Sequence, residues 1–118
     1  MKNLLKILLV LGILLTGSLS LNAKEIYLSQ QTTKDYSVHV KVYDDLKLGD
    51  NEFNVKILYK TKSLDGVNVN LKLYKPNGEI VEYKSNTIND KRNYTFDVKL
   101  IEKGQYKYLI TYNVMTGG

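Results

Sequence analysis

Apolar residues alternate with other residues along most of the chain after Lys24, and this period of two restricts the fold more than any other feature. Residues 36–43, for example, read YSVHVKVY. Such alternation places successive side chains on opposite faces of a β-strand. It recurs over residues 36–43, 53–60, 67–74, 94–101 and 106–114, with shorter runs at 25–29 and 79–84. The sequence therefore predicts seven strands with one apolar face each.

The segments between these runs contain turn-forming residues. They are residues 48–51, 65–66, 76–78, 89–91 and 103–104. No window has a sustained helical period bounded by capping residues. We therefore expect an all-β fold, an antiparallel immunoglobulin-like β-sandwich that lacks the cysteines and tryptophan of true immunoglobulin domains. A five-stranded oligonucleotide-binding barrel is the alternative, but its aromatic residues belong on an exposed face, and most tyrosines here have the inward parity.

The first 23 residues have the pattern of a secretory signal peptide. Lys2 and Lys6 accompany an apolar run, ILLVLGILL at residues 7–15, and a stretch with small polar residues leads to Ala23. The apolar run is shorter than the roughly 20 residues that a spanning helix needs. We predict cleavage after Ala23, leaving one periplasmic domain over residues 24–118 with no stable membrane span. Retention of residues 1–23 as an anchor is the alternative.

The charge of the chain argues against nucleic acid as a partner. The formal net charge is +5. Lys2 and Lys6 are the only charged side chains of the predicted signal peptide, so residues 24–118 carry 15 Lys and Arg against 12 Asp and Glu, a net charge of +3. Nucleic-acid-binding modules usually have a larger, clustered basic excess. Lysines at the outward parity, such as Lys41 and Lys72, are typical of solvated strand faces that discourage edge-to-edge pairing.

Residues suited to catalysis are scarce in this chain. The absence of cysteine excludes disulfides, thiolate metal sites and a cysteine nucleophile. His39 is the only histidine, and it has the outward parity of its strand, while no serine stands in a nucleophile-elbow context. A glycine-rich phosphate loop is also missing. We predict a protein that is not an enzyme, with no catalytic residues and no cofactor.

Three short patterns contain candidate ligands or a modification site. His39 and Met115 offer an imidazole and a thioether, which suit copper, although a lone surface histidine is usually no more than that. The acidic residues Asp44, Asp45, Asp50 and Glu52, with Asn51, match no calcium loop and are better interpreted as a solvated turn. The triplet Asn93-Tyr94-Thr95 fits the glycosylation pattern by coincidence. We therefore predict no metal site.

The only proline, Pro76, stands in the stretch YKPNGE at residues 74–79. Proline has φ fixed at about −65° and suits the second position of a β-turn, and Asn and Gly tolerate a positive φ after it. We interpret the stretch as a turn between two strands rather than as the rim of a site.

Three stretches together resemble the YtkA-like and FixH-like family of exported bacterial domains. They are LGDNEFNVKI (48–57), LDGVNVNLKLYKPNGE (64–79) and NYTFDVKLIEKGQYKYLI (93–110). The matching positions are Gly49, Asn51, Asp65, Gly66, Pro76, Tyr94, Val98, Leu100, Gly104 and Tyr106. The resemblance implies an immunoglobulin-like sandwich outside the cytoplasmic membrane, without enzymatic activity, and a link to copper supply for oxidases or to efflux systems. Two departures stand against direct copper binding. Lys75 occupies a place where some copper-associated relatives carry methionine. The FixH-type proteins keep a membrane segment, whereas this chain offers only a signal-like segment.

These observations leave three functional hypotheses open. The first is an accessory or binding module that docks on a protein of the cell envelope, such as a transport or oxidase-assembly complex, through strand edges and loops. The second is a copper-binding protein that uses His39 with Met115 or with the N-terminal amine of the processed chain. The third is a structural surface or adhesion subunit.

Overall fold

A computed structural model describes the backbone of residues 2–15, 24–43 and 46–116 and the side chains of residues 24–43 and 46–113. The elements are β1 (Lys2–Leu15), β2 (Glu25–Thr33), β3 (Tyr36–Tyr43), β4 (Gly49–Tyr59), β5 (Lys62–Ser63), β6 (Asn68–Tyr74), β7 (Ile80–Ser85), β8 (Tyr94–Leu100) and β9 (Gly104–Thr116). These described parts contain no helix long and apolar enough to cross a membrane.

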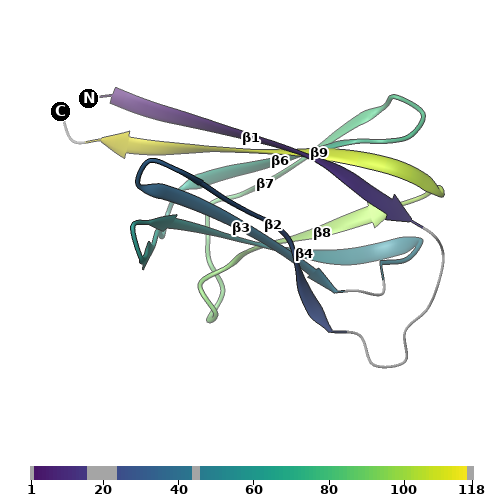
Figure 1. Cartoon of the computed structure of the whole chain (residues 1–118), viewed down its shortest axis with the longest axis horizontal. Coiled ribbons are helices and arrows are strands. Elements are labelled where there is room, and N and C mark those ends of the chain that lie inside the picture. The colour runs from purple at the N-terminus through teal and green to yellow at the C-terminus, as the bar shows by residue number, and fades with distance from the viewer. Residues whose placement is uncertain (1, 16–23, 44–45, 117–118) are drawn as a thin grey trace.

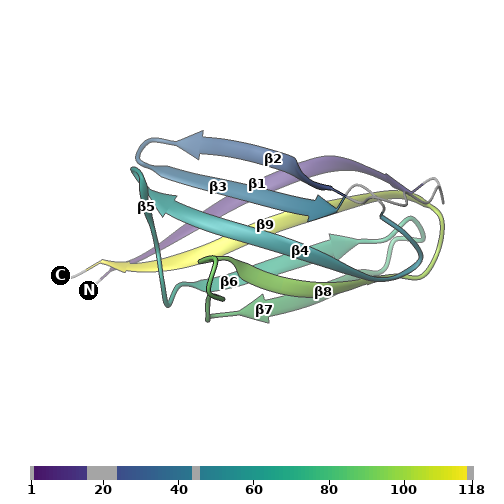
Figure 2. The same cartoon turned by 90° about the horizontal axis from the view of Figure 1, so that it is seen from below.

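The strands form two antiparallel sheets that lie face to face (Figure 1). One sheet, which we call the β9 sheet, has the order β1-β9-β6-β7. The other, the β4 sheet, has the order β2-β3-β4, and the outer side of β4 is shared by β5 and β8. Figure 2 shows β1 and β9 crossing behind the strands of the β4 sheet. The all-β antiparallel sandwich predicted from the alternation is therefore confirmed, and the barrel alternative is not what the chain forms.

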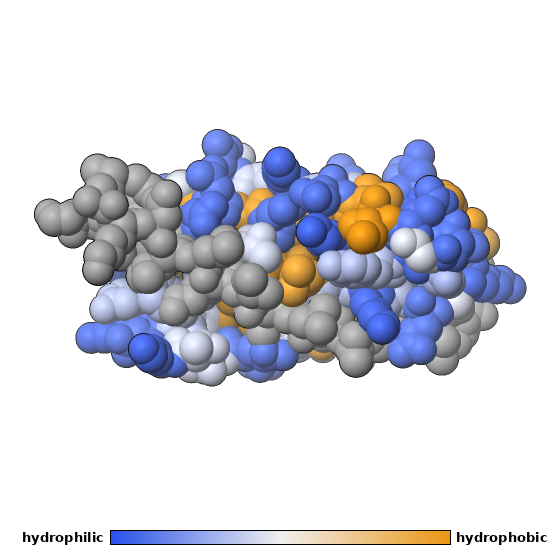
Figure 3. Space-filling model, turned by 90° about the horizontal axis from the view of Figure 1, so that it is seen from above, coloured by the Kyte–Doolittle hydropathy of each residue, from blue (hydrophilic) through white to orange (hydrophobic). Residues whose placement is uncertain are grey.

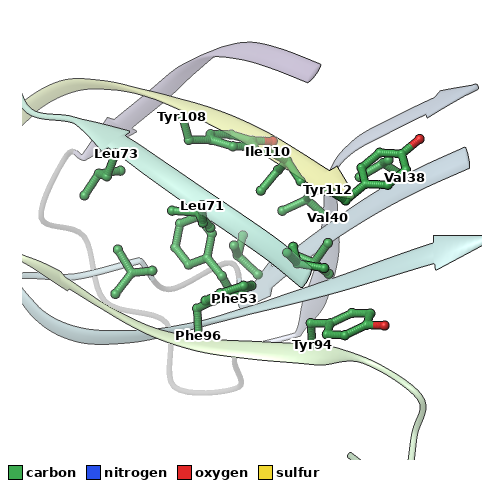
Figure 4. Packing of buried hydrophobic residues seen from close by; sticks show 14 of the residues in the cluster. Val38, Val40, Phe53, Leu71, Leu73, Tyr94, Phe96, Tyr108, Ile110 and Tyr112 are labelled. Atoms are coloured by element: carbon green, nitrogen blue, oxygen red, sulfur yellow. The ribbon is translucent and has the colours of Figure 1, made fainter. Parts of the chain in front are cut away.

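The core lies between the sheets and, among the described side chains, is built mainly from the inward parity of β3, β4, β6, β8 and β9 (Figure 4). Its buried members are Val38, Val40, Val42, Phe53, Val55, Ile57, Val67, Val69, Leu71, Leu73, Tyr94, Phe96, Val98, Leu100, Tyr106, Tyr108, Ile110 and Tyr112. Burial of this apolar surface is the main favourable term in folding. The alternation fails at Tyr59, which has the inward parity of β4 but is 39% exposed because it stands at the end of the strand.

Each of the seven runs of alternating residues is a strand in the structure. Two differences concern β4 and β5. β4 begins at Gly49, inside a segment expected to be a turn, because Gly49, Asp50 and Asn51 already pair with β8. β5 has two residues and was not expected. β1 lies within the segment interpreted as a signal peptide, so it belongs to the unprocessed chain, and removal of residues 1–23 stays a prediction.

A buried tyrosine fixes the passage from β8 to β9. The Tyr106 hydroxyl donates to the Glu102 carbonyl at 2.6 Å and accepts from the Glu102 N–H at 3.2 Å. Immunoglobulin-like sandwiches have such a tyrosine corner at the start of the strand that follows the crossover. Together with the crossovers between β5 and β6, β7 and β8, and β8 and β9, this corner supports the immunoglobulin-like assignment.

Pro76 lies in the hairpin turn between β6 and β7, as predicted. The Gly78 N–H donates to the Lys75 carbonyl at 3.0 Å, so proline occupies the second turn position. Gly78 takes the positive φ, 93°. The turn also contacts β9, because a Cβ added to Gly104 would lie 2.8 Å from the Pro76 ring. The single proline is therefore a packing element between the turn and β9.

Candidate binding surfaces

A group of exposed aromatic and apolar side chains lies at the β2 edge of the β4 sheet. We call it the β2 surface and define it as Ile26, Tyr27, His39, Lys41 and Tyr43. The last four lie on the outer face of β2 and β3, whereas Ile26 lies on the inner face because it pairs with the buried Val42. Ile26, Tyr27 and Tyr43 are 43%, 49% and 39% exposed. β2 is the edge of the β4 sheet, so one side of its backbone has no strand beside it in the described sheet.

Three of these side chains contact one another. The rings of Tyr27 and His39 meet edge to face, with centroids 5.7 Å apart and planes at 84°. The Lys41 Nζ lies 4.7 Å from the Tyr27 ring centroid, within the range of a cation–π contact. Tyr27 pairs with Lys41 in the register, just before a shift of register between Tyr27 and Ser29. The edge is therefore irregular, with a tyrosine half-covered by two basic side chains.

His39 has the outward position predicted for it, but its surroundings disfavour a cation. Partial burial lowers the pKa of His39 below its usual value of 6.5, and the charges of Lys41 and Lys56 lower it further. The same two charges repel a copper ion. Met115 belongs to the other sheet, where it pairs with Asn3, and its side chain lies outside the described residues.

The N-terminal amine of a processed chain is also distant from His39. Lys24 precedes Glu25, which lies opposite Tyr43 in the register. Tyr43 is four residues beyond His39 along β3, and four strand residues span about 13 Å. The described geometry thus supplies no second ligand for the alternative hypothesis of copper binding at His39.

The two other candidate patterns each contain a buried asparagine. Asn51 is buried, and its side-chain amide donates to the carbonyls of Lys47 and Gly49 at 2.7 and 3.1 Å, which closes the loop before β4. Asp44 and Asp45 lie outside the described residues. Among the residues that are described, no three His, Cys, Asp or Glu side chains gather as a metal site would require. Asn93 of the glycosylation pattern is buried, 9% exposed, so its side chain is not displayed on the folded surface.

A polar hollow that sequence reasoning missed lies at the end of the β9 sheet. It has a volume of about 660 Å³. Its lining consists of Asn68, Val69, Asn70, Lys84, Ser85, Asn86, Thr111 and Asn113. Asn68 faces Asn113 and Asn70 faces Thr111 across β6 and β9, so amides and a hydroxyl are adjacent there. Polar residues at outward positions of separate runs were the signal, but only the register brings them together.

The surroundings of the hollow are polar as well. Figure 3 looks onto the β9 sheet and shows hydrophilic side chains over most of its coloured surface, with apolar atoms in separate groups. The Asn70 amide donates to Glu82 at 3.1 Å, while its buried Oδ1 has no hydrogen-bond partner. One unpaired oxygen beside amides, hydroxyls and a single lysine does not specify a ligand. The β2 surface therefore remains the better-defined candidate.

Comparison with known proteins assigns no family to the chain. No family model, curated protein or solved structure matches the chain.

Proposed function

We propose that this protein is an exported, non-enzymatic binding module that docks on a protein partner in the cell envelope. The observation that carries the proposal is the β2 surface, where Ile26, Tyr27 and Tyr43 are each more than a third exposed on or beside an edge strand. Exposed tyrosine and isoleucine side chains next to unpaired backbone groups are the features that strand-based protein contacts use.

The side chains of the β2 surface also indicate what kind of partner surface would fit it. Tyrosine combines a large apolar area with a polar hydroxyl, and such residues dominate the binding energy of many interfaces. Lys41 and Lys56 place positive charge beside the aromatic cluster. A partner with an apolar centre and acidic residues at its rim would complement this arrangement.

A link to copper handling enters this proposal only through the partner. The resemblance to the YtkA-like and FixH-like family suggests a transport or oxidase-assembly complex. Direct copper binding by His39 is the weaker candidate, because two lysines surround it and Lys75 replaces the methionine of some relatives. We therefore propose an accessory role in which this chain contacts a protein rather than a metal.

Site-specific photo-crosslinking in living cells tests the proposal. A photo-reactive phenylalanine analogue replaces Tyr27 in the full chain, and a second version carries it at Lys72 on the outer face of the β9 sheet. We expect the Tyr27 position to give one adduct of defined mass with an envelope protein, because that position lies in the contact. The Lys72 position is expected to give none.

A matched variant makes the test specific. Ile26→Lys with Tyr43→Lys is expected to abolish the Tyr27 adduct while the unfolding midpoint stays within a few degrees, since both side chains are exposed. Equal adducts from Tyr27 and Lys72, or an adduct that survives the double substitution, would reject the β2 surface as the docking site.

A further inference from the structure

The outer edge of β9 is occupied by β1 in the unprocessed chain. β1 pairs antiparallel with β9 from Lys2 opposite Thr116 to Leu15 opposite Gly104, with one register shift between Leu11 and Ile13. All of β1 lies before Ala23, the predicted cleavage position. Processing there removes the neighbour of β9 on this side, while β6 stays paired on the other side.

The edge that processing exposes differs from the other edges of the sandwich. β9 is 13 residues long, pairs with β6 without a register shift, and has Lys107 as its one charged residue. By contrast, β2 has a register shift, β7 is six residues long, and β8 is seven residues long with Asp97 and Lys99 on it. Short length, irregularity and charge protect edge strands from pairing. β9 has little of this protection.

The layer beneath the exposed edge determines what fits there. The Tyr83 hydroxyl accepts from the Lys99 N–H at 3.2 Å, which sets β7 against β8. At the other side the rings of Tyr112 and Tyr36 are 6.1 Å apart, which sets β9 against β3. The strand order of each sheet then puts β1 on the same side of the sandwich as β2, and Figure 2 shows β1 crossing the β4 sheet at an angle.

Without β1, the β9 edge and the inner face of β2 form a ledge. Its floor includes Leu28, which is partly buried and packs on the core, and Ser29, which accepts a hydrogen bond from the Tyr108 hydroxyl at 2.9 Å. The wall is the free row of β9 backbone N–H and C=O groups. A single extended strand with apolar residues at alternate positions can pair with the backbone groups of this wall and cover this floor.

A second copy of the sandwich fits this ledge less well. Pairing two β9 edges about a two-fold axis would continue the β9 sheet from one copy to the next. Because β2 projects beneath the ledge in each copy, the two β4 sheets would then compete for the same space. One strand supplied by a different chain has no such conflict.

We propose that the processed protein binds an extended, alternately apolar segment of another envelope polypeptide as an antiparallel strand along β9, above β2. This inference rests on the export in the proposed function and on the predicted cleavage after Ala23, and it deepens the proposed function. The partner contact then combines backbone pairing at β9 with side-chain contacts at the neighbouring β2 surface.

The test uses a synthetic strand peptide and the chain exported from its full-length gene. The peptide spans residues 4–15 with Leu5→Thr, Ile7→Lys, Leu9→Thr and Leu11→Lys, so that it keeps the residues opposite Ile110 and Tyr108 and gains solubility. Mass spectrometry first establishes whether the exported chain begins at Lys24. Hydrogen exchange is then measured with and without the peptide. We expect amides of β9 to exchange about tenfold more slowly with the peptide, while those of β7 are unchanged.

Each outcome decides a separate point. A peptide of the same composition with scrambled order must give no protection, since alternation is what the ledge selects. A processed chain whose β9 amides ignore the strand peptide overturns the strand-addition proposal and leaves the proposed docking at β2 standing. An exported chain that still carries residues 1–23 overturns the strand-addition proposal, because β1 then keeps the β9 edge, and leaves the proposed docking at β2 standing. A processed chain that dimerises and protects β9 by itself assigns the ledge to a second copy and overturns the proposed occupant.

Discussion

Tyrosine hydroxyls tie together the connections of this sandwich, which contains no cysteine. The Tyr94 hydroxyl donates to the Leu64 carbonyl at 2.8 Å and accepts from the Val67 N–H at 3.0 Å. Tyr106 does the same for Glu102, and Tyr108 donates to Ser29. A buried hydroxyl without a partner would oppose folding, so each of these tyrosines stabilises the fold only with its particular partner. At this scale, the inward tyrosines were predictable from parity, but their partners were not.

Tyr106→Phe tests the corner between β8 and β9. The substitution keeps the buried ring and removes both contacts with Glu102, so we expect a loss of about 1–2 kcal/mol in the free energy of unfolding. Urea denaturation measures it. Tyr74→Phe is the control, because the Tyr74 ring is only partly buried, and it should change the free energy by less than about 0.5 kcal/mol. Equal losses from both variants would contradict a specific role for the corner.

His39 should titrate below its usual value of 6.5, because burial, Lys41 and Lys56 all lower its pKa. The imidazole resonances in NMR spectra give the midpoint directly. Lys56→Gln removes one of the positive charges and is expected to raise the midpoint. Because the folded pKa lies below the unfolded one, the stabilisation by neutral His39 is present above about pH 6.5 and is lost as the pH falls through the folded pKa. A midpoint that Lys56→Gln leaves unchanged would show that the charge of Lys56 does not lower the pKa of His39.

At the scale of elements, period-two alternation located the strands because an exposed and a buried face select different residues at successive positions. Beginnings and ends were harder to predict. Gly49 begins β4 only because β8, about 50 residues later, offers it the partner Leu100. Tyr59 kept the inward parity but lies where the opposite layer no longer covers it. Boundaries thus depend on distant strands that a local pattern does not contain.

The hairpin turn and the first residue of β9 are coupled through Pro76 and Gly104. Gly104 has a φ of 139°, and an added Cβ would lie 2.8 Å from the proline ring. We expect Gly104→Ala to lower the free energy of unfolding by about 1–3 kcal/mol, from backbone strain and from this contact together. Thermal denaturation measures the effect.

A double-mutant cycle separates the two causes. In a Pro76→Ala background the steric part of the Gly104→Ala loss should be recovered, whereas the backbone part should remain. Strictly additive effects would mean that the turn does not contact β9 in solution.

For the whole molecule, sandwich class followed from the sequence while sheet order did not. Neighbours such as β4 and β8, or β6 and β9, are far apart in the chain, and nothing local specifies their pairing. The candidate surface shows the same limit. The outward position of His39 was predicted, but its contact with Tyr27 depends on the irregular pairing of β2 with β3. Exposed Ile26 and Tyr43 also needed the structure, because exposure depends on what covers a strand.

The whole fold should be sensitive to alkaline pH, because ionised tyrosine is not tolerated in this core. Burial raises the pKa of Tyr108 to about 12, against the opposing effect of the hydrogen bond with Ser29, and burial with Tyr36 raises the pKa of Tyr112 to about 12. Folded pKa values above the unfolded value of 10 mean that the stabilisation is complete below about pH 10 and is lost as the pH rises through about 12. For Tyr108 the loss is at most about 3 kcal/mol.

Urea denaturation at a series of pH values from 8 to about 12 measures this decline. Tyr108→Phe has no proton to lose at that position, so its free energy of unfolding should fall less steeply between about pH 10 and 12 than that of the unsubstituted chain. Absorbance at the tyrosinate band should show the buried rings ionising together with unfolding, since the folded state holds them protonated. An equal slope for both proteins would mean that Tyr108 ionises as readily in the fold as in the unfolded chain, and that its hydroxyl is open to water rather than held against β2.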